Sequence, residues 1–234
     1  MSVPPLVSLH GISKSFGAVK ANANITLDIR AGCIKALLGE NGAGKSTLMS
    51  ILAGRFQPDA GSIRIQGVQR HFASTADALD SGIGMVYQHF MLVEPMTVAE
   101  NVFLGQKNRA WLSPARMEAQ VRQLADQYGL EVDPGAKVHS LSMGEKQRVE
   151  ILKLLFRDNN VLILDEPTTV LTPKEVEHLF QAMRTIAAQG KAVVFISHKL
   201  AEVMDVADEI AILRQGTITD ELPAHEVHSQ AELA

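Results

Sequence analysis

The sequence predicts an α/β protein in which buried parallel strands alternate with helices, after a strand-rich first third and a helical insertion. Three observations support this prediction. The first third alternates short strand-like runs with turns, the middle third spaces its apolar residues as a helix does, and the last third alternates strands with helices. Apolar strands joined by crossover helices are most readily buried as a parallel sheet.

In the first third, the expected strands are short apolar runs bounded by turn residues. The last two would form a hairpin that turns at Gln66-Gly67, and the first helix would start directly after a glycine-rich turn. The expected strands are Val7–His10, Ile25–Ile29, Ile34–Leu38, Ser62–Ile65 and Val68–Phe72, and the expected helix is Lys45–Ala53.

The rest of the chain divides into the helical insertion and a second run of strands and helices. After a strand at Ile83–Tyr87, the insertion has expected helices at Val98–Leu104, Pro114–Tyr128 and Glu145–Phe156. The last third has expected strands at Val161–Leu164, Ala192–Ile196 and Glu209–Leu213, with helices at Pro173–Ala188 and up to Val206, and Glu226–Ala234 starts a further helix.

The composition is that of an ordinary globular protein. Of its 234 residues 46% are hydrophobic and 21% charged, and the formal net charge of −4 gives no basic excess, so we expect no nucleic-acid partner. The lone Cys33 lies in an apolar stretch and is expected to be a buried structural thiol. Because the sequence has neither a signal peptide at Met1–Pro5 nor a long apolar run, we expect partner subunits to provide any link to a membrane.

A phosphate-binding loop is the strongest motif. Gly39-Glu40-Asn41-Gly42-Ala43-Gly44-Lys45-Ser46-Thr47 matches G-x-x-x-x-G-K-[ST], the Walker A pattern, between an expected strand and an expected helix. The glycines let successive N–H groups face phosphate oxygens, Lys45 brings a cation to the β- and γ-phosphates, and Ser46 can ligate Mg²⁺. The structural alternative is an ordinary turn before a helix, and the strand–loop–helix context disfavours this alternative. The motif predicts nucleotide binding without separating kinases, GTPases and ATPases.

Two adjacent acids end the apolar strand Val161–Leu164. A strand buried on both faces delivers such carboxylates at its C-terminal edge, beside the phosphate-binding loop. Asp165 is then expected to hold Mg²⁺, and Glu166 to polarise the attacking water as a general base. Adjacent acids after a strand are often only a helix cap. Here the phosphate-binding loop favours the functional interpretation.

Further positions identify a family. Leu141-Ser142-Met143-Gly144-Glu145 resembles the signature motif of ATP-binding-cassette (ABC) proteins, whose commonest form is Leu-Ser-Gly-Gly-Gln, and it precedes Asp165 by the short separation expected of that family. Gln88 resembles the Q-loop glutamine, His198 the H-loop histidine, and Phe16 the aromatic residue on which adenine stacks. Alone, a single Gln, His or Phe would be read as structural. The resemblance runs from about Val7 to Gly216.

The resemblance implies the fold of an ABC-type P-loop NTPase in a single domain, 1–234. A RecA-like parallel-sheet core and an antiparallel β-subdomain would comprise 1–90 and 158–221, and a helical subdomain with the signature motif would comprise 91–157. It also implies ATP and Mg²⁺ as ligands, with Ser46, Gln88 and Asp165 at the metal. Glu166, His198 and Gln88 would form the catalytic set, while Phe16 and Gly39–Thr47 would bind ATP.

The same resemblance implies how the protein works. Two cassettes pair head to tail, and ATP lies between the phosphate-binding loop of one and the signature residues Ser142, Met143, Gly144 and Glu145 of the other. Gln88 would report the γ-phosphate to the segment Val98–Gly144, where a membrane subunit docks. The first implied partner is a second cassette, either another copy of this chain or a second domain in tandem with it. The other implied partners are transmembrane permease subunits and, indirectly, a solute-binding protein. The expected location is peripheral, on the cytoplasmic face of the cell membrane, and the isolated chain is expected to be soluble.

Three departures from the family pattern affect these expectations. Met143 replaces the usual first signature glycine, Glu145 replaces the usual glutamine, and Thr172 stands where the family commonly has an aspartate that couples the two sites. With Lys45, Asp165, Glu166 and His198 intact, we expect ATP binding and hydrolysis to survive. The departures resemble importers of sugars and nucleosides, and Ile83–Val93 resembles the nucleoside branch. Proteins of this class usually carry two cassettes in tandem, the second degenerate, and the resemblance implies that this chain is the first, catalytically complete cassette.

The leading hypothesis is therefore an ATP-hydrolysing importer motor. The alternative is a soluble, non-transport ABC ATPase that acts on ribosomes or DNA, but the long charged linker, coiled-coil insertion or basic surface typical of that class is missing from the sequence. A small-molecule kinase would leave the signature motif unexplained.

Overall fold

The computed structural model describes residues 4–105 and 113–227, and two β-sheets organise them. The larger sheet consists of β3 (Ile34–Leu38), β6 (Ile83–Val86), β7 (Val161–Asp165), β8 (Ala192–Ser197), β9 (Glu209–Arg214) and β10 (Thr217–Pro223). Its order is β10-β9-β3-β8-β7-β6, and every pair except β10–β9 is parallel. The predicted parallel sheet is confirmed.

The smaller sheet is antiparallel and has the order β2-β1-β4-β5. Its strands are β1 (Val7–Phe16), β2 (Val19–Ile29), β4 (Ala60–Ile65) and β5 (Val68–Arg70). The predicted hairpin turn is confirmed, since Gln66 and Gly67 have φ of 49° and 80°, as a two-residue hairpin turn requires. The first two strands are much longer than predicted, because polar residues and register shifts in their outer halves hide the alternation.

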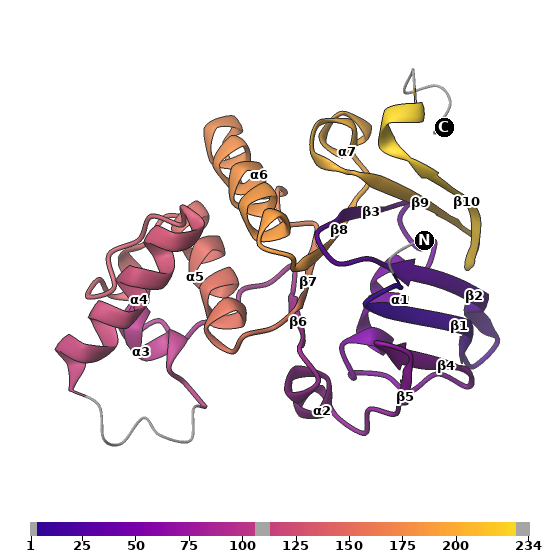
Figure 1. Cartoon of the computed structure of the whole chain (residues 1–234), viewed down its shortest axis with the longest axis horizontal. Helices are drawn as coiled ribbons and strands as arrows, with labels where there is room; N and C mark the ends of the chain where they lie inside the picture. The colour runs from indigo at the N-terminus through magenta and orange to yellow at the C-terminus, as the bar shows by residue number, and fades with distance from the viewer. Residues whose placement is uncertain (1–3, 106–112, 228–234) are drawn as a thin grey trace.

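Seven helices lie in the described ranges, with 3₁₀ turns at η2 (Val138–Ser140) and η3 (Ala224–Glu226). Figure 1 shows α3, α4 and α5 gathered on one side of β6 and β7, with the smaller sheet on the other side. The helical insertion predicted between the two runs of strands is therefore present. The helices are α1 (Lys45–Leu52), α2 (Thr75–Asp80), α3 (Val98–Val102), α4 (Pro114–Tyr128), α5 (Met143–Phe156), α6 (Pro173–Ala188) and α7 (Leu200–Val206).

Two elements escaped prediction, and one helix begins earlier than predicted. The helix α2 is only six residues long, and the edge strand β10 is polar, so neither has a clear periodicity. The helix α5 starts at Met143 instead of Glu145, because Ser142 and Glu145 form a capping box around its first turn. Residues 228–234 of the last predicted helix lie outside the described residues.

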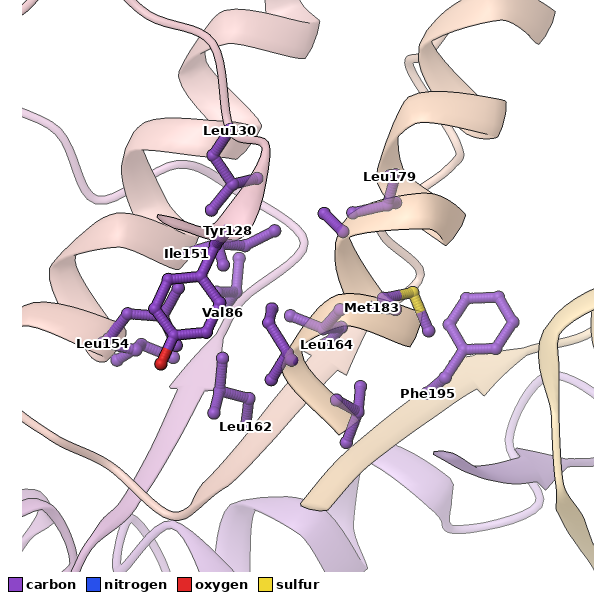
Figure 2. Packing of buried hydrophobic residues seen from close by; sticks show 14 of the residues in the cluster. Val86, Tyr128, Leu130, Ile151, Leu154, Leu162, Leu164, Leu179, Met183 and Phe195 are labelled. Atoms are coloured by element: carbon purple, nitrogen blue, oxygen red, sulfur yellow. The ribbon is translucent and has the colours of Figure 1, made fainter. Parts of the chain in front are cut away.

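The larger sheet separates two hydrophobic cores. Leu162 and Leu164 of β7 face a core built with α4, α5 and α6, whereas Val161 and Ile163 face a core built with α1 and the smaller sheet. Figure 2 shows part of the first core, where Leu154, Leu179 and Phe195 approach from different elements. Burial on both faces holds the ends of these strands in place, and those ends carry the predicted site. In the described ranges, no helix has both the length and the apolar character needed to cross a bilayer.

Candidate functional site

The predicted motifs follow neighbouring strands at one edge of the larger sheet. Leu38 of β3 pairs with Ser197 of β8, and Ile196 of β8 pairs with Asp165 of β7. Because these strands are parallel, their C-terminal ends meet, and this edge is where α/β proteins bind ligands. The phosphate-binding loop, the acid pair and His198 therefore leave the sheet side by side.

The phosphate-binding loop runs from β3 into α1. Its Gly44 is the N-cap of α1 with φ of 104°, and a Cβ at this position would overlap the Ala21 carbonyl oxygen and lie 2.7 Å from Asn22 Nδ2. Only glycine fits such a backbone. No side chain caps α1, so its first N–H groups can serve an anion.

Lys45 is folded into this loop. Its Nζ donates to the carbonyl oxygens of Gly39 at 2.6 Å and Glu40 at 2.8 Å, and the residue is 5% exposed. Burial lowers the pKa of the Lys45 ammonium, although the charges of Glu166 and Asp165 oppose this change. The cation therefore lies beside the predicted acids.

Ser46 and Asp165 lie close to each other. The Ser46 hydroxyl donates to Asp165 Oδ1 at 3.3 Å, joining the start of α1 to the end of β7. Burial, assisted by the charge of Glu166, raises the pKa of Asp165 against the opposing effects of Ser46 and Lys45. A hydroxyl and a carboxylate oxygen are ligands that Mg²⁺ accepts, and this ion usually takes its remaining ligands from phosphates and water. The pair therefore fits Mg²⁺ delivered with a nucleotide.

Glu166 and His198 are in direct contact. Glu166 Oε1 lies 3.1 Å from His198 Nδ1, while the Glu166 N–H donates to the Ile196 carbonyl oxygen at 3.1 Å. Glu166 adopts a left-handed backbone with φ of 46°, which is strained for a non-glycine residue and recurs at functional sites. The backbone bond to β8 helps to hold the carboxylate beside the histidine.

Gln88 and Phe16 are not joined to this cluster by hydrogen bonds or ring contacts. Gln88 is exposed in the loop after β6, and no hydrogen bond links its side chain to Ser46 or Asp165. Phe16, at the end of β1, is 44% exposed and packs edge-on against Phe56 with ring centroids 5.3 Å apart. Their predicted roles at Mg²⁺ and adenine stay predictions.

The signature residues surround the start of α5. Ser142 Oγ accepts a hydrogen bond from the Glu145 N–H at 3.2 Å, and Glu145 Oε2 accepts one from the Ser142 N–H at 2.8 Å. Met143 is 49% exposed, whereas Gly144 is buried. The helix start and its N–H groups thus lie at the motif itself.

Two acids near these groups were missed by sequence reasoning. Glu202 of α7 accepts from Thr168 Oγ1 at 2.7 Å and from Ser197 Oγ at 3.4 Å, so it joins the loops that carry Glu166 and His198. Glu175 of α6 reaches the signature motif, where Ser142 Oγ donates to it at 3.4 Å. A sequence pattern could have drawn attention to Glu175, since Thr172 and Glu175 have the capping-box spacing. No local pattern identifies Glu202.

Comparison with known proteins gives a consistent set of relatives. Residues 22–169 match the family described as ABC transporter. The glucose import ATP-binding protein of Haloferax volcanii is 42% identical, over all of this chain and 48% of that protein. The guanosine import ATP-binding protein of Bacillus subtilis is 45% identical, over 90% of this chain and 42% of that protein. The chain therefore spans about half the length of these curated relatives.

Solved structures show the same likeness. A dimeric structure of a post-hydrolysis state of an ATP-binding cassette, bound to ADP and Pi, is 26% identical to this chain. It matches with a TM-score of 0.80 over 93% of this chain and 98% of that one.

Proposed function

Because this chain belongs to the ABC transporter family, we propose that it is the ATP-binding and ATP-hydrolysing motor of an importer. The observation that carries the proposal is the meeting of three motifs at one sheet edge. Lys45 of the phosphate-binding loop, the pair Asp165–Glu166, and His198 leave neighbouring parallel strands, and Glu166 contacts His198 at 3.1 Å. A phosphate cradle, a metal ligand and a base are what ATP hydrolysis requires.

In this proposal each side chain has one task. Gly39–Thr47 wraps the phosphates with backbone N–H groups, and Lys45 turns from its loop carbonyls to the β- and γ-phosphates. Glu166 accepts the proton of the attacking water, and His198 orients Glu166 and contacts the γ-phosphate. Ser46 and Asp165, with Gln88, would hold Mg²⁺, which supplies charge neutralisation at the phosphates when bound. Phe16 would stack on adenine.

The signature residues are proposed to act on a second cassette. Ser142 and Met143 are exposed at the start of α5, where a hydroxyl and helix N–H groups can receive a γ-phosphate. The similar cassette that was solved as a dimer bound to ADP and Pi supports a pairing of two cassettes. ATP would join the two cassettes, and hydrolysis would release them.

The importer itself is proposed from the relatives, which are named for glucose and guanosine import. We propose that the cargo is a sugar or a nucleoside. Permease subunits would dock on the helical subdomain, 91–157, and a solute-binding protein would deliver the cargo to them. The motor would then work at the cytoplasmic face of the membrane.

The test is phosphate release from ATP by the purified chain over a series of protein concentrations, with Glu166→Gln as the control. A specific rate that rises with protein concentration is expected, because two chains must meet to complete each site. A rate that is independent of concentration, or equal in the Glu166→Gln control, would count against the proposal. ATP binding without turnover at any concentration would refute a site built from two copies of this chain.

A further inference from the structure

We propose that the Glu175 carboxylate occupies the anion-binding N-terminus of α5 at the signature motif. The γ-phosphate of ATP bound to a second cassette must displace this carboxylate. The inference rests on the proposed function, because that function supplies the incoming phosphate. It concerns a residue outside every motif named above and assigns it a role in regulating the ATP sandwich.

The two oxygens of Glu175 serve two different elements. Oε2 accepts from the Thr172 N–H at 2.9 Å and the Thr172 hydroxyl at 2.9 Å, both at the start of α6 itself. Oε1 lies 3.4 Å from Ser142 Oγ and also lies against Gly144, where an added Cβ would overlap it. Glu175 therefore connects the start of α6 to the start of α5.

Gly144 is adapted to this contact. A Cβ at position 144 would overlap Glu175 Oε1 and lie 2.6 Å from its Cδ and 2.8 Å from its Cγ. Any larger residue would therefore push the carboxylate away from the N–H groups of α5. The close approach gives Gly144 a packing reason within this chain, before any partner is considered.

The carboxylate and an incoming phosphate need the same donors. The hydroxyl of Ser142 and the N–H groups that begin α5 are the groups proposed above to bind the γ-phosphate, and here a negative side chain already accepts from that hydroxyl and lies against Gly144. Hydrogen bonds, chiefly from the Thr172 N–H, lower the pKa of Glu175 although burial opposes them, so the group is ionised at neutral pH. Two anions cannot share one helix end without strong repulsion.

Helix capping alone does not explain this geometry. The helices α2 and α3 have the same capping box, from Ser74 and Asp77 and from Thr97 and Glu100. Glu175 differs from Asp77, whose hydrogen bonds stay within Ala73–Asp77, because it also contacts a second helix. The additional contact is the one that falls on the signature motif.

The first experiment measures ATP-driven dimerisation. In a Glu166→Gln background, which keeps ATP uncleaved, the dimer dissociation constant is measured by sedimentation with and without Glu175→Gln. Glutamine preserves a capping box and removes the charge, so the constant should fall about fivefold or more, as expected when an anion leaves a helix N-terminus. Asp77→Asn is the matched control and should leave it unchanged. An unchanged or weaker dimer in Glu175→Gln overturns the inference.

A second measurement needs no dimer. The Gly144 amide signal is followed by NMR while inorganic phosphate is added to the intact chain and to Glu175→Gln. The variant should show a saturable shift at Gly144 with at least about fivefold tighter apparent binding than the intact chain. Equal responses, including none in either protein, overturn the inference. If ATP dimerises no variant, the proposed sandwich is wrong, and the phosphate titration alone still decides the role of Glu175.

Discussion

At the scale of single residues, the site places a buried cation close to two acids and a histidine. Lys45 is a buried cation that two carbonyl oxygens hold, and Asp165 is a half-buried acid whose pKa is raised. Glu166 sits on a strained backbone and touches His198. Buried charges with few partners cost stability, so these residues trade stability for function.

Two substitutions should affect ATP affinity and ATP turnover differently. Glu166→Gln removes the proposed base and leaves the phosphate-binding loop intact, so ATP affinity should stay within about twofold while turnover falls by about 10² or more. Lys45→Ala removes the cation from the cradle, and ATP affinity itself should fall by about tenfold or more. Calorimetric titration and phosphate release measure the two quantities. Loss of ATP affinity in Glu166→Gln would contradict these separate roles.

Asp165→Asn should stabilise the fold and remove Mg²⁺-dependent activity. Because burial raises the native pKa of Asp165, its charged form costs stability at neutral pH. The variant should therefore melt about 2 °C or more higher at pH 7. The difference should shrink as the pH falls through the raised native pKa and vanish below about pH 3, where the carboxyl is neutral in both states. A melting difference that grows on acidification would contradict this explanation.

At the scale of elements, α7 joins the loop that carries Glu166 to the loop that carries His198. Glu202 accepts hydrogen bonds from Thr168 and Ser197, and it pairs with Lys199 at 2.9 Å. Thr168 lies two positions after Glu166, and Ser197 directly precedes His198. The contact between Glu166 and His198 thus depends on a helix that carries neither residue.

Glu202→Ala should therefore impair turnover more than binding. We expect kcat to fall about tenfold with little change in the KM for ATP, because a misplaced catalytic group costs rate while the phosphate-binding loop is untouched. Glu202→Gln keeps acceptors for Thr168 and Ser197 and should recover most of the rate. A merely structural role would lower the melting temperature of both variants without this split between kcat and KM.

Elements and motifs with strong local signals were predictable from the sequence. The bounds of α4 and α6 match the prediction, because Pro114 and Pro173 stand at their first positions and stop signals follow. The phosphate-binding loop was found because its nine residues are contiguous. The strand β10, the bridge through Glu202 and the second contact of Glu175 depend on tertiary contacts, and no local pattern encodes them.

At the scale of the whole molecule, an ionic cluster around the buried Lys35 joins β3, β9 and the edge strand β10. Lys35 is 1% exposed and pairs with Glu209 at 2.9 Å and with Glu221, and Glu209 also pairs with Arg30. Burial would raise the pKa of Glu209, but the hydrogen bond and charge of Lys35, with the charge of Arg30, outweigh it and lower that pKa. The cluster fixes the edge of the sheet.

Lys35→Met should therefore destabilise the fold at neutral pH. Removing the buried partner leaves two carboxylates near the core, and we expect a loss of about 2–3 kcal/mol, less than for a fully buried pair because both acids reach solvent. Arg30→Met, at an exposed pair, should cost less than about 1 kcal/mol. Chemical denaturation measures both. The Lys35 effect should persist above the ordinary Glu pKa and disappear as pH falls through the lowered pKa of Glu209. A loss that grows in acid would contradict this assignment.

The position of Lys45 affects how nucleotide affinity depends on folding. Since its ammonium already donates to Gly39 and Glu40, much of its rotamer freedom is lost when the chain folds. When ATP binds, the Lys45 side chain has to change direction but loses little further conformational freedom, which lowers the entropic cost of binding. Any solvent or substitution that loosens this loop would therefore weaken the fold and the affinity together.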